Sequence, residues 1–453
     1  MKTVIIKNNW FTESDLRLDA SFHLSEGHLT LVTFQNAAIK TKPLAQITEK
    51  IFYGNRSKRV YVNNPKKGLP FIKGADITKA NFSSLKYISK ARTANLENYF
   101  LEEGWTLITR SGTIGNTAYV NKDFIGKAAS DDIIRVVPKN IPSGFLYAFL
   151  SSKYGQNLLK HGTYGAVIQH IEPEHIENIP IPIFPPQKQK EIHNLIVEAA
   201  DLRVEANRLL EDSVTYFNNL YSAKTNKITK IFTRNVKDLS FSWAAYNNNK
   251  EVSEITNKFD ENYLKIGEVS ESIFAPPMFK HIYLEKDNGN PFLTGSELTR
   301  QNPKYYRWLS PKGVKDIQTY KVEKNTLLLY KSGTTDGGIL GNVFIADDNL
   351  NGVCLSDHVI RIRISDINLS YWIYAFLKSE AGVKLLQSIA TGTMIPFITP
   401  ERLSVLTVPK PDENFQTICD NISAYLYKRV EANNKESQAI HLIEKEIDSW
   451  QQS

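Results

Sequence analysis

The apolar positions after Pro186 follow an alternating three- and four-residue spacing, which is typical of a long helix with one apolar seam. The double proline at 185–186 suits the start, because the first helical turn does not need the N–H that proline lacks. No glycine or proline interrupts the stretch up to Tyr221. At about 1.5 Å per residue the helix would be about 50 Å long, so its seam needs a partner helix. The predicted seam positions are Ile192, Leu195, Ala199, Leu202, Ala206, Leu209, Ser213, Tyr216 and Leu220.

A second stretch with similar spacing ends the chain, after Pro411. It contains the pentapeptide Arg-Val-Glu-Ala-Asn at 429–433, and the first stretch contains the same pentapeptide at 203–207. Two long apolar-faced helices that share a pentapeptide half a chain apart are expected to pair with each other. The apolar positions of the second helix are Ile418, Ile422, Leu426, Val430, Ile440, Ile443, Ile447 and Trp450.

The pentapeptide is one part of a longer repeat, because matched blocks precede both helices in the same order. Arg-Ser-Gly-Thr matches Lys-Ser-Gly-Thr, Ser-Asp-Asp-Ile-Ile-Arg matches Ser-Asp-His-Val-Ile-Arg, and Ile-Pro-Ile-Pro matches Leu-Thr-Val-Pro. Such collinearity indicates a unit of one domain and one helix that is written twice. The matched blocks lie at 47–52 and 269–274, 70–74 and 291–295, 110–113 and 331–334, 130–135 and 356–361, 147–150 and 374–377, and 179–182 and 406–409.

Each copy predicts a mixed domain of short strands and turns. In the first copy, β-branched and turn-bounded runs predict strands at 29–34, 106–109, 117–120 and 133–137, and the run 145–159 predicts one amphipathic helix. The chain therefore predicts an α+β fold of two repeated domains, each closed by a long helix. The predicted segments are 1–184 (first domain), 185–237 (central helix and linker), 238–410 (second domain) and 411–453 (C-terminal helix).

The loops between matched blocks differ in the two copies. Arg-Ser-Lys-Arg at 56–59 faces Pro-Pro-Met-Phe at 276–279, and the loop at 165–170 faces an unrelated one at 392–397. Two similar platforms with different loops suit a protein that reads two different targets. Alternatively, the loops drifted apart after duplication.

Charge and composition narrow the class of protein. A net charge of +7 favours a polyanionic partner such as nucleic acid. Cys354 and Cys419 stand far apart, which fits a reducing compartment and excludes a disulfide framework. No apolar run approaches the roughly 18 residues that cross a bilayer, so we expect a cytoplasmic protein without a membrane partner.

Candidate catalytic motifs are missing. The double prolines lack the neighbours of an amino-methyltransferase motif, and the glycine-rich run 332–341 lacks the Gly-Lys-Ser/Thr of a phosphate-binding loop. His161, His170 and His175 fit no standard spacing of metal ligands. We therefore expect a binding or scaffold subunit with no metal site, rather than an enzyme.

The ordered set of motifs resembles a known family. Two variable domains, each with a Ser-Gly-Thr turn, a Ser-Asp-x-Ile/Val-Ile-Arg strand and an Ile-Pro-Ile-Pro-like block before a long helix, resemble the specificity subunit of type I restriction-modification systems. The resemblance implies two target recognition domains separated by two long helices, which form an antiparallel coiled coil with pseudo-twofold symmetry. It also implies recognition of a bipartite, asymmetric duplex DNA site, in defence against phage.

The resemblance assigns the chemistry to other proteins. Two methyltransferase (modification) subunits that use S-adenosylmethionine, and translocating endonuclease (restriction) subunits that use ATP and Mg²⁺, are expected to assemble on this chain. The chain itself is expected to bind no cofactor. Other classes consistent with the sequence are a single-chain DNA methyltransferase or nuclease with a diverged active site, and a stand-alone DNA-binding regulator.

Basic and polar loop residues are the candidate DNA contacts, because lysine and arginine bind phosphates while amide, hydroxyl and guanidinium groups read base edges. The candidates in the first domain are Arg56, Lys58, Arg59, Lys73, Arg110, Ser111, Thr113, Tyr164 and Gln169. The candidates in the second domain are Lys280, Thr294, Lys304, Lys331, Ser332, Thr334 and Thr393.

A second apolar stripe runs beside the seam of the central helix and consists of Leu210, Val214, Phe217 and Tyr221. Two interpretations are open. Either the stripe is an interface that receives the methyltransferase subunits, or it packs against the adjoining domain of the same chain.

Overall fold

The computed structural model describes residues 23–37, 40–54, 56, 58–161, 170–222, 233, 245–286, 288–303, 307–333, 340–392 and 394–450. The chain divides into two compact units, one formed by Met1–Val204 with Glu431–Ser453 and the other by Glu205–Val430. Both divisions follow the valine of the repeated pentapeptide. Each unit therefore contains one mixed domain and half of each long helix, whereas the sequence predicts the helices as separate segments.

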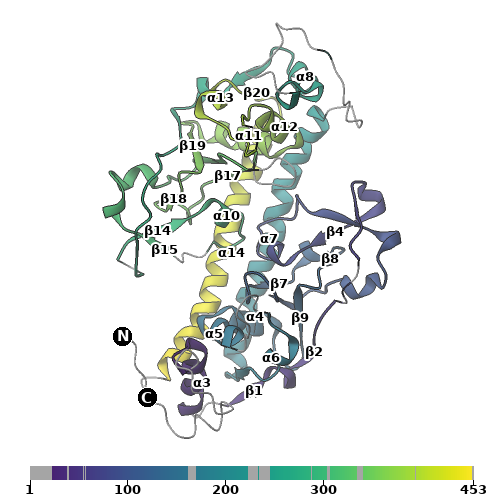
Figure 1. Ribbon diagram of the computed structural model, residues 1–453, viewed down its shortest axis with the longest axis vertical. Coiled ribbons are helices and arrows are strands. Elements are labelled where there is room, and N and C mark those ends of the chain that lie inside the picture. Colours follow the sequence, from purple (N-terminus) through teal and green to yellow (C-terminus); the bar gives the residue numbers. More distant parts are fainter. Residues whose placement is uncertain are drawn as a thin grey trace. The chain divides into compact units, whose positions relative to one another are not determined.

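The first unit contains a four-stranded sheet in the order β2-β9-β6-β7, a second in the order β3-β5-β4-β8, and the pair β1-β10 (Figure 1). The strands are β1 (Thr41–Pro43), β2 (Thr48–Tyr53), β3 (Tyr61–Val62), β4 (Gly68–Ile72), β5 (Lys86–Ser89), β6 (Thr106–Thr109), β7 (Thr117–Tyr119), β8 (Ala128–Ala129), β9 (Ile133–Pro138) and β10 (Pro180–Pro182). The helices are α3 (Glu26–Asn36), α4 (Ser143–Ser151), α5 (Lys153–His161), α6 (Pro173–Ile176) and the first part of α7 (Pro186–Tyr221).

The second unit repeats this topology strand for strand, with sheets β12-β19-β16-β17 and β13-β15-β14-β18 and the pair β11-β20. Its strands are β11 (Tyr263–Lys265), β12 (Ser272–Phe274), β13 (Tyr283–Leu284), β14 (Asn290–Leu293), β15 (Arg307–Leu309), β16 (Leu327–Tyr330), β17 (Val343–Ile345), β18 (Cys354–Leu355), β19 (Val359–Arg363) and β20 (Thr407–Pro409). Its helices are α8 (Lys250–Asn257), α9 (Ile266–Val269), α10 (Gly295–Leu298), α11 (Ile367–Lys378), α12 (Glu380–Ser388), α13 (Pro400–Ser404) and the first part of α14 (Phe415–Ser449). The predicted repeat and α+β fold are confirmed.

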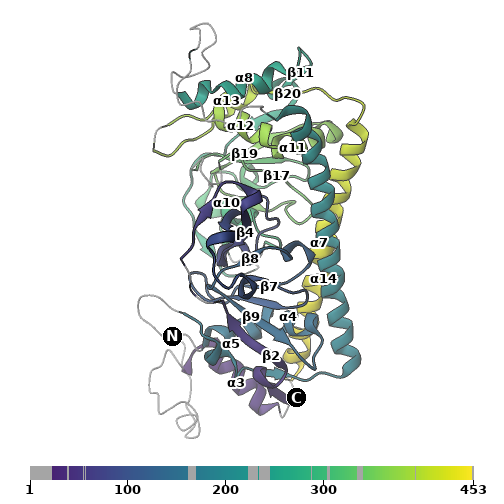
Figure 2. The ribbon, with the colours of Figure 1, turned by 90° about the vertical axis from the view of Figure 1, so that its right-hand side faces the viewer.

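The long helices α7 and α14 pair antiparallel within each unit, as predicted (Figure 2). In the first unit Lys188 bonds to Glu446, and Glu198 lies 2.7 Å from Lys435. Residues further along α7 therefore contact residues with lower numbers on α14, so the helices run antiparallel. In the second unit Glu205 lies 2.9 Å from Lys428, and further along α7 Tyr216 bonds to Asp412, which precedes α14.

The buried face of α7 is wider than the predicted seam. Ile192, Ala199, Ala206 and Ser213 are buried as expected, but the predicted seam residues between them are only half-buried and Leu220 is 42% exposed. The residues one position later are buried in their place, because α7 packs against a domain helix as well as against α14. These additional buried residues are Ile196, Arg203, Leu210 and Phe217.

The packing of Phe217 decides between the two interpretations of the second stripe. Phe217 is fully buried, 4.8 Å from the ring of Trp372 and 5.5 Å from that of Phe376, both on α11 of its own unit. Leu210 is also buried, and Val214 and Tyr221 are half-buried against the same core. The prediction of a subunit interface at Leu210, Val214, Phe217 and Tyr221 is therefore replaced by packing within the second unit.

Two local predictions in the first domain are wrong. Residues 29–34 belong to the helix α3, which begins after Ser25, whose side chain accepts a hydrogen bond from the backbone of His28. Burial of Phe34 against Phe149 favours this helix over the strand that the β-branched residues indicate. The single helix predicted at 145–159 is two helices, because Ser152 adopts an extended backbone and caps α5 through a bond from Gly155.

Candidate nucleic-acid interface

An acidic loop lies between β8 and β9 of the first unit and contains Asp131 and Asp132. Arg135, on β9, holds its backbone in place, because the fully buried guanidinium donates to the carbonyls of Ala129 at 2.7 Å and Ile133 at 2.9 Å. A third bond, at 3.4 Å, reaches the carbonyl of Ser130. Burial lowers the pKa of Arg135 to about 10, so it is still protonated at neutral pH. The loop therefore has a fixed backbone on which its side chains are displayed.

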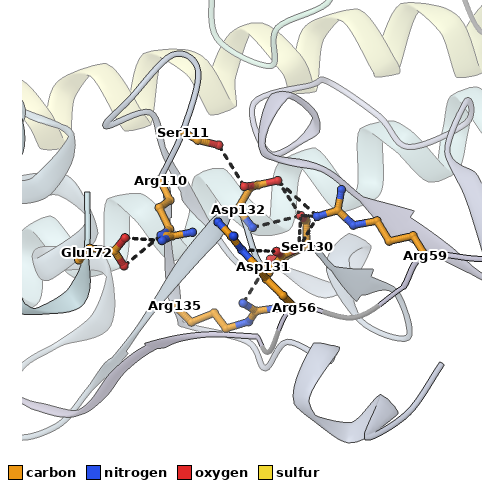
Figure 3. Close-up of polar contacts among 9 residues, drawn as sticks. All are labelled: Arg56, Arg59, Arg110, Ser111, Ser130, Asp131, Asp132, Arg135 and Glu172. Atoms are coloured by element: carbon orange, nitrogen blue, oxygen red, sulfur yellow. Dashed lines mark hydrogen bonds and ion pairs between the residues drawn. The ribbon is translucent and has the colours of Figure 1, made fainter. Parts of the chain in front are cut away.

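Two candidate arginines meet this loop (Figure 3). Nη2 of Arg59 bonds to Asp131 and lies 3.2 Å from Oγ of Ser130 and 3.4 Å from Asp132. Nε of Arg56 lies 3.7 Å from Asp131. The Asp131 side chain is only 9% exposed, whereas that of Arg59 is 35% exposed and that of Arg56 is 74% exposed. Both arginines are therefore at the surface above a buried carboxylate.

Arg110 and Ser111 approach the loop from the end of β6. The hydroxyl of Ser111 donates to Asp132 at 3.1 Å, and the backbone N–H of Arg110 donates to the carbonyl of Asp132 at 3.0 Å. The Arg110 guanidinium is turned to Glu172, which it meets with two nitrogens, and it lies 4.3 Å from the ring centre of Tyr53. Arg110 is 5% exposed, so it supports the loop from inside the domain.

These ion pairs shift the pKa values of their members. Burial acts to lower the pKa of Arg59 and of Arg110, but the hydrogen bonds and charges of Asp131 and Glu172, respectively, outweigh it and raise both values. The hydrogen bond from Arg110 lowers the pKa of Glu172. Both arginines and Glu172 are consequently charged across the physiological range.

The other candidates in the first domain lie outside this cluster. Lys58, Lys73 and Thr113 are exposed, and the ammonium of Lys73 lies 5.7 Å from the ring centre of Tyr61. Tyr164 and Gln169 fall outside the described residues.

The second unit builds the same backbone with different side chains. Arg361 takes the place of Arg135, donates to the carbonyls of Leu355 and Ser356, and has a pKa that burial lowers to about 10. The N–H of Lys331 donates to the carbonyl of His358 at 2.8 Å, which is the bond that Arg110 makes to Asp132. In the second unit a lysine and a histidine thus replace an arginine and an aspartate.

The counter-ion of Arg110 has no equivalent in the second unit. The N–H of Ile398 donates to the carbonyl of Lys331, as that of Ile171 does to Arg110, so Thr399 stands at the position of Glu172. Within the described part of the unit, Lys331 makes no ion pair.

The remaining candidates in the second domain have separate positions. Lys280 is exposed, Ser332 is half-buried, and Thr294 caps α10 through bonds to Glu297 at 2.7 Å from its N–H and 2.9 Å from its hydroxyl. Lys304, Thr334 and Thr393 fall outside the described residues.

Sequence reasoning missed the carboxylates that complete the cluster: Asp131, Asp132 and Glu172. The Ser-Asp-Asp run belongs to the matched blocks of the repeat and so resembles scaffold, and Glu172 has no motif around it. The difference between Asp132 and His358 inside otherwise matched blocks was the signal that could have revealed the loop as variable.

The arrangement presents cations and hydroxyls on a loop at the surface of the first unit, which suits binding of a polyanion. In the part of the chain that the structure describes, no three His, Cys, Asp or Glu side chains are grouped to hold a metal ion. No helix among those residues is both long enough and apolar enough to span a bilayer.

Both copies of the repeat match a known protein family. A family model described as the type I restriction modification DNA specificity domain matches residues 37–207 and 260–442, which is most of the chain. A specificity subunit of the type I restriction enzyme MjaVIII from Methanocaldococcus jannaschii is 31% identical over 115 residues. This alignment spans only a quarter of the relative's length and 25% of this chain.

Two solved structures align with nearly the whole chain but loosely. The S subunit of a type I restriction-modification system from M. genitalium has 12% identity and a TM-score of 0.34, with 91% of this chain and 95% of that one covered. The HsdS subunit from Thermoanaerobacter tengcongensis has 15% identity and a TM-score of 0.29, with 91% and 96% covered. The assignment rests on the family model: the chain belongs to the type I restriction-modification DNA specificity family.

Proposed function

We propose that this chain is the DNA-specificity subunit of a type I restriction-modification complex and recognises a bipartite, asymmetric duplex site without catalysing a reaction itself. The observation that carries the proposal is that the two units share one backbone arrangement but place different side chains on the equivalent loop. The acidic loop of the first unit holds two arginines, whereas the equivalent loop of the second contains His358 and is bonded by the backbone of Lys331. Two readers with different side chains in one chain suit a site whose halves differ.

The exposed and half-buried candidates divide between phosphate binding and base reading. Lysines and flexible arginines attract the phosphate backbone, and hydroxyl or guanidinium groups with a fixed direction discriminate base edges. Arg110 and Thr294 bond within their own domains, so we assign them a supporting role. The proposed DNA contacts that the structure describes are Arg56, Lys58, Arg59, Lys73, Ser111, Thr113, Lys280, Lys331 and Ser332.

The curated relative is named as a type I restriction enzyme specificity subunit, which supports a similar place for this chain in a larger complex. We propose that two methyltransferase subunits, which supply S-adenosylmethionine, and translocating endonuclease subunits, which supply ATP and Mg²⁺, assemble on it. Phe217 and Leu210 are buried within the chain, so these partners have to bind other surfaces.

Mapping of methylated bases in the host genome, with and without this gene, tests the proposal. We expect a motif with two specified halves and an unspecified spacer that disappears on deletion and returns when the gene is restored. Persistence of every methylated motif after deletion contradicts the proposal.

Two other outcomes identify the competing functions. Methylation or cleavage of DNA by the purified chain without partners would show an enzyme with a diverged site. Tight sequence-specific binding by the chain alone, with no methylated motif that depends on it, would show a regulator.

A further inference from the structure

Arg59 and His281 occupy equivalent positions in the two units. Each lies two residues before the first strand of the second four-stranded sheet of its unit, β3 or β13. The Arg59 guanidinium carbon lies 5.4 Å from the ring centre of Phe71, and the imidazole of His281 lies 5.3 Å from that of Phe292. The strand registers relate these two phenylalanines, since Phe71 pairs with Ala128 and Phe292 with Cys354 in parallel. The structure thus pairs Arg59 with His281, whereas the sequence comparison of 56–59 with 276–279 pairs Arg59 with Phe279, two residues earlier.

The Arg59 guanidinium has one terminal nitrogen that is occupied by the acidic loop and one that is not directed at its carboxylates. Its Nη2 is bonded to Asp131, Ser130 and Asp132, which belong to the loop that Arg135 holds rigid. The other terminal nitrogen points away from both carboxylates (Figure 3). A guanidinium held by carboxylates loses rotamer freedom before it meets a ligand, so less entropy is lost on binding.

We propose that Arg59 reads a base and that Asp131 and Asp132 position it. The ligand of its outward terminal nitrogen, Nη1, is a hydrogen-bond acceptor on a base edge, such as O6 or N7 of guanine in the major groove. His281 is the equivalent reader of the second half-site. The inference rests on the proposed function and assigns the residue that specifies one base pair in each half.

Charge distinguishes this role from phosphate binding. Two carboxylates beside Arg59 offset its attraction for a polyanion, but they leave its hydrogen-bond donors directed at a neutral base. Arg56 and Lys58 are better placed for phosphate, because Arg56 is 74% exposed and Lys58 is also exposed on the same loop. A phosphate contact also does not need the fixed orientation that the loop imposes on Arg59.

The second unit cannot read the same base in the same way. His358 replaces Asp132, and within the described residues no arginine or lysine pairs with Asp357. The imidazole of His281 instead shares a hydrogen bond with the hydroxyl of Tyr283 at 3.2 Å. A ring with two nitrogens presents a narrower set of donors than a guanidinium, so the two half-sites should differ at the base pairs that these residues specify.

The test expresses full-length variants with the native methyltransferase genes in a host that lacks the wild-type gene, and maps the methylated motif. Arg59→Ala and Asp132→Asn should each relax one base pair in the same half of the motif, with a roughly 10- to 100-fold loss of preference there. Arg59→Lys should also relax that base pair, since the freely rotating ammonium of lysine does not keep a donor in the direction that the carboxylates fix for the guanidinium. His281→Ala should relax one base pair in the other half only.

Lys58→Ala is the matched control, because it removes a neighbouring charge from the same loop without touching the carboxylates. It should lower methylation evenly at all sites and leave the motif unchanged. Thermal unfolding of each purified variant separates specificity from folding.

The inference is overturned if Arg59→Ala and Asp132→Asn fold as the wild type does and methylate an unchanged motif, because the ion pair is then structural only. It is also overturned if Arg59→Ala weakens all sites evenly, as a phosphate contact would. If the variants do not fold, the motif of the folded Arg59→Lys protein decides. Failure of the proposed function looks different, since the wild-type chain would then specify no bipartite motif.

Discussion

Arg203 and Arg429 occupy the same place in the two copies of the pentapeptide, yet their opposite charges come from different parts of the molecule. In the first unit Arg203 bonds to Glu436 at 2.6 Å and to Asn433 at 3.0 Å, both on the partner helix α14. In the second unit Arg429 lies 3.6 Å from Asp347, which follows β17 in the domain. The first arginine joins helix to helix, and the second joins helix to domain.

The positions exchanged between the units explain the difference. By the pentapeptide register, Leu210 of α7 corresponds to Glu436 of α14, and Asn121 of the first domain corresponds to Asp347 of the second. Among the described residues, each unit places a carboxylate beside this arginine, but on a different element. The duplicated fold therefore keeps a carboxylate beside this arginine, although the residue that supplies it differs between the two units.

Of the substitutions at these charged sites, loss of Glu436 should lower the free energy of unfolding most. Glu436→Leu places in α14 the residue that α7 has, and it leaves Arg203 buried without its carboxylate. We expect a loss of about 3–5 kcal/mol in the free energy of unfolding, measured with urea. The double variant with Arg203→Leu should recover most of that loss, and a cost below about 1 kcal/mol for Glu436→Leu would show that the pair contributes little.

Removal of Asp347 should cost less, because the guanidinium of Arg429 keeps its hydrogen bond to Tyr425 at 3.0 Å. We expect Asp347→Asn to lower the free energy of unfolding by about 2 kcal/mol. Adding Leu210→Glu gives the second unit the arrangement of the first and should restore part of the stability. If the added glutamate destabilises the variant further, the two sources of charge are not interchangeable.

Substitution of Lys378 should stabilise the fold, whereas the substitutions at Glu436 and Asp347 should destabilise it. Burial, with the nearby charge of Arg429, lowers the pKa of this lysine to about 8, so folding opposes its protonation. Lys378→Met should therefore raise the free energy of unfolding at pH 7 by about 1–2 kcal/mol. Between pH 8 and 10 the wild-type lysine loses its proton in the folded state, so the advantage of the variant should shrink in thermal scans. Ser151 at the equivalent position in the first unit offers Ser151→Ala as a control without that pH dependence.

Disruption of the Arg110–Glu172 pair should change the free energy of unfolding least, because the Glu172 side chain is 30% exposed. Glu172→Gln should cost about 0.5–1 kcal/mol at neutral pH. The pKa of Glu172 is lowered from 4.5, so its contribution is present above that pH and is lost as the pH falls further. The difference between variant and wild type should therefore close below pH 4.5, and a constant difference would exclude an ionic origin. Thr399→Glu, which introduces the carboxylate beside Lys331, should stabilise the second unit by a similar amount.

The long elements of the fold could be predicted from the sequence, but their buried faces only in part. The prolines and the uninterrupted spacing place the start of α7 within one residue of Pro186 and its end at Tyr221. The spacing does not say whether Leu209 or Leu210 is buried more deeply, because both flank the centre of the apolar stripe. Leu210 is buried because a domain helix covers α7 from that side, and this contact depends on tertiary structure.

The candidate site was predictable only as a set of loops. The loop arginines stand out by composition, but Arg59 meets Asp131 across 72 positions of sequence, and no local spacing indicates that pairing. Arg110 shows that sequence can also suggest a DNA contact where there is none on the surface. A basic residue beside a Ser-Gly turn predicts a surface contact, but Arg110 is buried and bonds to Glu172. Charge alone does not separate a cation that binds DNA from one that supports its own domain.

Arg135 and Arg361 have a consequence for how such a protein can change. Each clamps its loop through main-chain carbonyls, which every amino acid possesses, and therefore constrains the path of the loop without constraining its side chains. Asp132 can become His358 while the loop keeps its course. A substitution at that position alters what is displayed and leaves the support intact, so new target preferences can be sampled one residue at a time without unfolding the reader.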